Sequence, residues 1–196
     1  MCNPVNTLLD CVFDLKSRVC DLYSENFQEI FNRDSPGLNE VDAKSLLSDM
    51  YNNGYIEFFR EQRKILLKDR INSAEIDSQW YFSLTEKGGE LWESIYQPNW
   101  DLYVGVDSEF PADGSSSEII TIRTGTFEVL HNLLKELQIM PGYKEISPQE
   151  SLHTWKPTYW KALTHGFTVT VLVGEESSES LAQYVSRLNW RNLRES

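Results

Sequence analysis

The residues best suited to binding chemistry gather between positions 153 and 165. This stretch holds two histidines and three large aromatic side chains: His153, Trp155, Tyr159, Trp160 and His165. Aromatic rings interleaved with lysines can form a surface for a peptide, a nucleotide base or an acidic loop. The same pattern is typical of a loop packed over a sheet, which is the interpretation we favour. Trp155, Tyr159 and Trp160 stay candidate surface residues.

A second candidate is the charged stretch at residues 60–70, which holds five of the eighteen Lys and Arg residues of the chain. Arg63, Lys64, Lys68 and Arg70 are its candidate interaction residues. Acidic residues lie before, within and after it: Glu57, Glu61, Asp69, Glu75 and Asp77. A solvated, salt-bridged surface is the favoured interpretation. The alternatives are an acidic protein partner and, third, nucleic acid. A short helix that pairs Glu61 with Lys64 is consistent with the spacing.

Catalytic and metal-binding motifs are missing from the sequence. No His-Glu-x-x-His, Cys-x-x-Cys, Gly-x-Ser-x-Gly or phosphate-binding Gly-x-x-x-x-Gly-Lys segment occurs. His131, His153 and His165 are too scattered to predict a metal centre, although His153 and His165 with a carboxylate remain an alternative. We therefore expect a protein that is not an enzyme, with no catalytic residue, no metal and no cofactor.

Apolar periodicity predicts a long first helix. Six apolar residues recur at alternating intervals of three and four: Val5, Leu8, Val12, Leu15, Val19 and Leu22. Packing in the core is the favoured role of this stripe. The alternative is that the stripe forms a seam through which two copies of the chain associate as a homodimer.

Further patterns complete the first half. A helical pattern at residues 27–32 and a turn at residues 34–37 precede a helix over about residues 39–52, with Val41, Leu46, Leu47 and Met50 as inner residues. Strands follow at residues 55–59 and 80–84. A helix capped by Thr85 and stopped by Pro98 follows the second strand. We expect Gly88 and Gly89 to permit close packing against the strand.

This order of elements resembles that of winged helix-turn-helix proteins over about residues 5–100. The resemblance rests on the segments LLSDMYNNGYIEFF and YFSLTEKGGELW, and on Leu84, Thr85 and Gly88 as a Leu-Thr-x-x-Gly element. The longer segment Leu-Thr-x-x-Gly-x-x-x-Trp-Glu, followed by Pro-x-Trp, is similar to segments of a family of uncharacterised bacterial proteins. The resemblance implies a recognition helix at residues 39–52 and a wing at residues 60–70.

Charge argues against DNA as the ligand of that helix. Glu40, Asp42 and Asp49 face a single lysine, Lys44, whereas helices that enter the groove usually meet phosphates with Lys, Arg and polar donors. Carboxylates a few ångström from phosphate oxygens are repelled.

The second half predicts a small α+β domain at residues 101–196, after a winged-helix-like domain at residues 1–100. Strands are expected at residues 102–106, 118–124 and 167–173, and Thr126 caps a helix through about Gln138. Leu181, Tyr184, Val185 and Leu188 predict a final helix. Residues 143–165 have no clear pattern.

Composition limits the function. The formal net charge of −12 disfavours nucleic acid and anionic membranes as partners of the average surface. No apolar run reaches the length of a membrane helix, no signal peptide is evident, and the three cysteines lie within the first twenty residues, which predicts a cytoplasmic protein. We expect an acidic adaptor, regulator or immunity-type protein that binds another protein. The alternative is a transcription regulator that contacts DNA through the wing at Arg60–Arg70.

Overall fold

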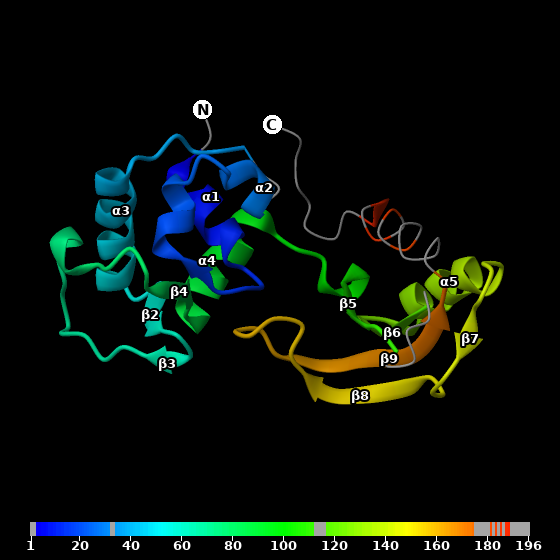
Figure 1. Cartoon of the computed structure of the whole chain (residues 1–196). Helices are drawn as coiled ribbons and strands as arrows, with labels where there is room; N and C mark the ends of the chain where they lie inside the picture. The colour runs from blue at the N-terminus through cyan, green and yellow to red at the C-terminus, as the bar shows by residue number, and fades with distance from the viewer. Residues whose placement is uncertain are drawn as a thin grey trace. The chain divides into compact units, whose positions relative to one another are not determined.

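The chain forms two compact units, each with one antiparallel sheet (Figure 1). The computed structural model describes residues 3–31, 34–111 and 117–174, and residues 181, 183, 185, 187 and 188. The first unit comprises Met1–Ile95 and Thr158–Lys161, and the second comprises Tyr96–Pro157 and Ala162–Ser196. The prediction of an α+β fold is confirmed.

The first unit places helices before and after a short sheet. Its elements are α1 Pro4–Cys11, β1 Ser17–Arg18, the 3-10 helix η1 Val19–Tyr23, α2 Phe27–Phe31, α3 Glu40–Asn52, β2 Ile56–Arg60, β3 Arg63–Lys64, η2 Ser73–Glu75, β4 Tyr81–Leu84 and α4 Glu86–Tyr96. The strand order is β1-β4-β2-β3. Phe58 lies opposite Phe82 and Ile56 opposite Leu84, and all four side chains are buried.

Local sequence sets the ends of α3 and α4. The Asn39 side chain accepts a hydrogen bond from the Asp42 backbone N–H at 2.9 Å and so caps α3. Gly54, at φ +75°, takes the left-handed conformation that follows α3. Thr85 caps α4 by accepting from the Gly88 N–H at 3.1 Å, as its position in the sequence predicts.

The long first helix predicted over residues 5–22 is wrong. α1 ends at Cys11, and residues 17–18 instead pair with β4. Leu8, Val12 and Val19 are buried within the first unit, whereas Leu15 is 69% exposed. The stripe is therefore split between a helix, a bend and a 3-10 helix, and it supplies no continuous seam for a homodimer.

The tip after β2 also differs from its prediction. Residues 63–64 form strand β3, which pairs with β2, in place of a short helix. Glu61 takes a positive φ of 55° in the tight turn between them. Lys64 forms an ion pair with Glu57 on the adjacent strand. This pair takes the place of the predicted pair between Lys64 and Glu61.

The core of the first unit closes around Trp92. Its indole is fully buried, stacks on Phe13 with ring centroids 5.2 Å apart, and meets the edge of Trp160 at 6.0 Å. The Trp92 Nε1–H donates to the buried Asp10 carboxylate at 2.9 Å. Trp160 reaches this core from the short segment Thr158–Lys161, so residues far apart in the sequence complete one core.

The second unit is a sheet with a helix on one face. Its elements are η3 Trp100–Leu102, β5 Val104–Glu109, β6 Glu118–Thr124, α5 Phe127–Gln138, β7 Lys144–Glu145, β8 Glu150–Trp155 and β9 Leu163–Val173. β9 pairs with β6, β7 and β8, and β6 also pairs with β5. Leu130, Leu133 and Leu134 of α5 pack on Ile122 and Val171 of the sheet.

The strands predicted at residues 118–124 and 167–173 are present, the first with the predicted bounds and the second extended back to Leu163. The strand predicted at residues 102–106 begins later, at Val104, because residues 100–102 form η3. Residues 144–155, which have no clear pattern, contribute β7 and β8. Leu181 and Val185 have helical backbone and pack on the core that contains α5. Tyr184 lies outside the described residues. The boundary between the units, expected after residue 100, falls instead after Ile95. Residues that follow α4 form hydrogen bonds within the second unit. For example, the Asp101 carbonyl accepts from the Thr126 hydroxyl at 3.1 Å.

We predict that Trp160→Ala lowers the free energy of unfolding by about 3–5 kcal/mol, because it empties a buried site beside Trp92. Gly89→Ala tests the same contact from the other side. An added Cβ on Gly89 would lie 2.0 Å from Trp160 Cε3, so we expect a loss of about 1–3 kcal/mol. Urea denaturation followed by circular dichroism measures both.

Phe110→Ala is the control, since Phe110 is 71% exposed. Its unfolding free energy should stay within about 0.5 kcal/mol of wild type. A Trp160→Ala protein as stable as the Phe110→Ala protein would contradict this description of the core.

Candidate interaction surface

The outer face of α3 is acidic. Glu40, Asp42 and Asp49 are all exposed, while Ala43 and Leu47 face the core. Glu40 and Asp42 lie in the first turn of α3, which Asn39 caps. The helix dipole favours negative charge at this end of a helix. The charges that argue against DNA in the sequence therefore point outward.

Val41 stands among these acids and is 72% exposed. Its prediction as an inner residue is wrong, because Ala43, Leu47 and Met50 form the buried stripe at intervals of four and three. Val41 is out of phase with that stripe. An exposed apolar side chain beside carboxylates suits contact with a protein better than contact with a phosphate backbone.

Glu40 has two polar partners. Lys44 Nζ lies 2.8 Å from Glu40 Oε1, and the Ser78 hydroxyl donates to the same oxygen at 3.0 Å. The hydrogen bond from Lys44, followed by that from Ser78, holds the pKa of Glu40 below its ordinary value. Glu40 therefore stays ionised, and the one lysine of α3 offsets charge on its own helix.

The wing, defined as residues 60–70, carries the candidate cations Arg63, Lys64, Lys68 and Arg70, and all four are exposed. Lys64 is paired with Glu57. Within the part of the chain that the structure describes, no carboxylate lies within ion-pair distance of Arg63, Lys68 or Arg70. Leu66, between them, is 90% exposed.

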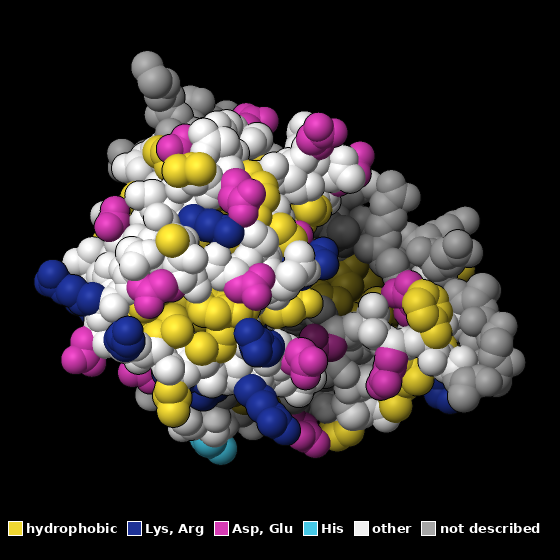
Figure 2. All heavy atoms as spheres, turned by 60° about the vertical axis from the view of Figure 1, so that its left-hand side comes forward, with side chains coloured by type: hydrophobic (Ala, Val, Ile, Leu, Met, Phe, Trp, Pro, Cys, Tyr) yellow, Lys and Arg dark blue, Asp and Glu magenta, His cyan; other side chains and the backbone are white. Residues whose placement is uncertain are grey.

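Acids and bases alternate on this side of the first unit. Figure 2, which brings forward the side that carries α3 and the wing, shows Lys and Arg side chains separated by Asp and Glu side chains. A duplex backbone requires a run of cations that follows its phosphates. The visible pattern favours short-range contacts with a mixed protein surface.

The Tyr159 hydroxyl forms hydrogen bonds within the first unit. Its hydroxyl accepts from the Leu84 N–H at 2.7 Å and donates to the Val12 carbonyl. Burial, above all, raises the pKa of the phenol well beyond its ordinary value. Tyr159 is half-buried, and its hydroxyl joins β4 to the residue that follows α1.

Trp160 and Trp155 are also interior residues, at 9% and 8% exposed. The Trp160 indole N–H donates to the Phe13 carbonyl at 2.6 Å, and the Trp155 indole N–H donates to the His165 carbonyl at 2.7 Å. Both polar ends are used inside their own units. Packing, the interpretation favoured from the sequence, therefore describes Trp155 and Trp160, and their placement as candidate surface residues is corrected.

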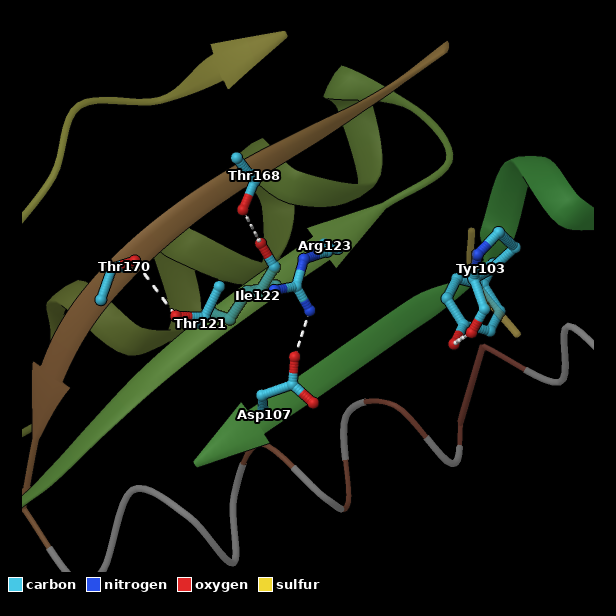
Figure 3. A network of polar contacts seen from close by, with 8 residues as sticks. Tyr103, Asp107, Thr121, Ile122, Arg123, Thr168 and Thr170 are labelled. Atoms are coloured by element: carbon cyan, nitrogen blue, oxygen red, sulfur yellow. Dashed lines mark hydrogen bonds and ion pairs between the residues drawn. The ribbon is translucent and has the colours of Figure 1, made fainter. Parts of the chain in front are cut away.

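The second unit presents a polar sheet face opposite α5 (Figure 3). Thr121 and Thr170 face each other across β6 and β9 with hydroxyls 3.1 Å apart, and Arg123 forms an ion pair with Asp107 on β5. Thr168 donates to a β6 carbonyl at 3.1 Å. These groups satisfy one another, as cross-strand pairs do on a solvated sheet.

The histidines are distributed unevenly. His153 lies directly opposite His165 in the β8–β9 ladder, and His131 lies on α5 with its ring stacked on Phe127. Within residues 3–31, 34–111, 117–174 and the five described later ones, no three His, Cys, Asp or Glu side chains are grouped to hold a metal ion. The pairing of His153 with His165 could be predicted only from the register of β8 and β9. The sequence pattern of residues 143–165 is irregular and does not indicate that register.

No helix in the described part of the chain combines the length and apolar character needed to cross a membrane. Comparison with protein-family models, with curated proteins and with solved structures gave no match. Function must therefore be argued from the surface itself.

Tyr159→Phe tests the interior position of the phenol. The change leaves the Leu84 N–H and the Val12 carbonyl without their phenol partner, so we expect the free energy of unfolding at pH 7 to fall by about 1–3 kcal/mol. Tyr51→Phe is the matched control, because the Tyr51 hydroxyl bonds the Lys68 carbonyl at the exposed surface. Urea denaturation should place it within about 0.5 kcal/mol of wild type.

The raised pKa of Tyr159 makes this difference depend on pH. Below about pH 10, the ordinary tyrosine value, the phenol is neutral in both states and its full contribution is present. Above it the unfolded chain ionises first, so the contribution falls by up to about 1.4 kcal/mol per pH unit. A stability gap between wild type and Tyr159→Phe that stays constant up to pH 11 would contradict a buried phenol.

Proposed function

We propose that this chain is an acidic, non-enzymatic interaction or regulatory protein that binds a cationic partner protein through α3. The exposed carboxylates of Glu40, Asp42 and Asp49 carry this proposal. An adaptor or an immunity-type protein that masks a basic partner fits this charge, because complementary potentials speed encounter and exclude like-charged competitors.

The arrangement of the first unit supports a winged-helix-like assignment. Helices α1 to α3 precede the sheet, and β1-β4-β2 is the order expected when a short first strand pairs with the returning strand of a wing. In that arrangement α3 is the helix that a nucleic-acid reader would insert into a groove. In this chain we infer that α3 binds a protein instead.

Charge supports a protein partner over DNA. Two unit charges 4 Å apart interact by about 1 kcal/mol in water and about 4 kcal/mol near a protein surface. Three outward acids opposite phosphates would therefore oppose binding strongly. Opposite lysines and arginines the same acids attract, and Val41 adds apolar area at the centre of the contact.

The partner we infer is a soluble protein with a basic face, in the cytoplasm. The formal charge of −12 supports long-range attraction between the two. Binding would then regulate the partner, because α3 covers the basic face of the partner in the complex.

A transcription regulator that contacts DNA through the wing is the second candidate. Arg60, Arg63, Lys68 and Arg70 support it, because all four are exposed and the described residues place no acid within ion-pair distance of them. Such a wing would lie along a phosphate backbone while α3 stays outside the groove.

Affinity capture with a matched pair of baits tests the proposal. We expect wild type to enrich a basic protein from lysate of the native host, and Glu40→Lys/Asp42→Lys/Asp49→Lys to lose it. The control Glu109→Lys/Glu128→Lys/Glu136→Lys makes the same change in net charge on exposed acids of the second unit and should retain it. Equal recovery by the two variants would refute the role of α3.

Fluorescence anisotropy with a random-sequence duplex separates the two candidates. At about 50 mM salt, where phosphate contacts are strongest, we expect no binding at micromolar protein, because acids lie among the wing cations. Binding that disappears in Arg63→Ala/Lys68→Ala/Arg70→Ala, while Lys135→Ala of α5 retains it, would instead establish the wing as a DNA contact.

A further inference from the structure

Two of the three histidines of the chain form a cross-strand pair. His153 of β8 and His165 of β9 are direct partners in an antiparallel ladder. Direct partners project to the same face, with Cβ atoms about 4.5–5.5 Å apart. Two imidazoles at this separation can converge on one ion.

Both side chains are exposed, so a solvated ion can reach them. The Thr164 hydroxyl lies 3.1 Å from His165 Nδ1. When Nδ1–H donates to that oxygen, Nε2 carries the lone pair that a metal requires. A polar partner on the second ring nitrogen is the usual support of a histidine ligand.

The backbone around the pair is held in place. The Trp155 indole N–H donates to the His165 carbonyl at 2.7 Å, and the same indole packs on Gly166, where an added Cβ would lie 2.2 Å from Trp155 Nε1. Thr154, next to His153, takes a positive φ of 57°. Such strained residues persist where the surrounding contacts impose them, and they are frequent beside functional sites.

We propose that His153 and His165 bind a divalent transition-metal ion of the borderline class, with zinc as the representative. Neutral imidazole is a preferred ligand of Zn²⁺, Ni²⁺ and Cu²⁺, whereas Mg²⁺ and Ca²⁺ prefer oxygen. The described residues supply no third ligand from His, Cys, Asp or Glu, so water completes the coordination. The site is an exchangeable one and not a closed structural centre.

Metal binding would join β8 to β9 beside the loop that connects them. That loop contains Thr158–Lys161, the segment that brings Tyr159 and Trp160 into the first unit. An ion that binds only the folded pair stabilises the hairpin by mass action.

Calorimetric titration of the full chain with zinc chloride tests the site. A Cys2→Ser/Cys20→Ser background removes two of the three thiols as competing ligands, and the third, Cys11, is buried. We expect one zinc per chain, with the affinity reduced at least tenfold in His153→Gln and in His165→Gln, and about tenfold in Thr164→Val, whose hydroxyl supports His165. Calcium chloride should produce no binding heat.

His131→Gln is the matched control and should bind zinc as the parent does, because His131 lies on α5 and is outside the ladder pair. Zinc should also raise the thermal unfolding temperature of the parent and of His131→Gln, with no rise in His153→Gln. Circular dichroism confirms that each variant is folded. Binding unchanged in His153→Gln, or no zinc binding by the parent at millimolar concentration, would overturn the proposal.

Discussion

The packing of Trp160 against residues 1–95 of the first unit is the interaction on which the remaining structure of that unit depends. Its indole covers Gly89 so closely that no side chain fits there, meets Trp92 edge-on and donates to the Phe13 carbonyl. Lys161 adds an ion pair with Glu93 at 2.6 Å. A four-residue segment from late in the sequence, Thr158–Lys161, thereby contributes to the core of the first unit.

That contact also decides which residues remain for function. Tyr159, Trp160 and Trp155 resemble the hot spots of an interface, yet their rings and polar ends are used inside the protein. Exposed side chains of the first unit include the carboxylates beside Val41 on α3 and the cations of the wing. A surface of mixed charge with isolated apolar side chains is consistent with a regulated protein contact, which is why we place the proposed function on α3.

Local patterns allowed much of the fold to be predicted. Asn39, Thr85 and Thr126 mark helix starts because their side chains accept backbone N–H groups, and strong alternation marks β4, β6 and β9. Contacts between residues far apart in the sequence could not be predicted from local patterns. Apolar spacing across residues 5–22 fits a helix, but pairing of residues 17–18 with β4 overrides it. β8 is an edge strand with mostly exposed side chains, so it has no apolar alternation, and the His153–His165 pair depends on its register.

Fragment complementation tests the central claim that Thr158–Lys161 completes the first unit. A fragment of residues 1–97 is mixed with a synthetic peptide of residues 155–163, and binding is followed by calorimetric titration and by the unfolding free energy of the fragment. We expect an unstable fragment that the peptide stabilises in a saturable way, whereas a peptide with alanine at positions 159 and 160 should have no effect. A fragment as stable as the whole chain, indifferent to the peptide, would contradict it.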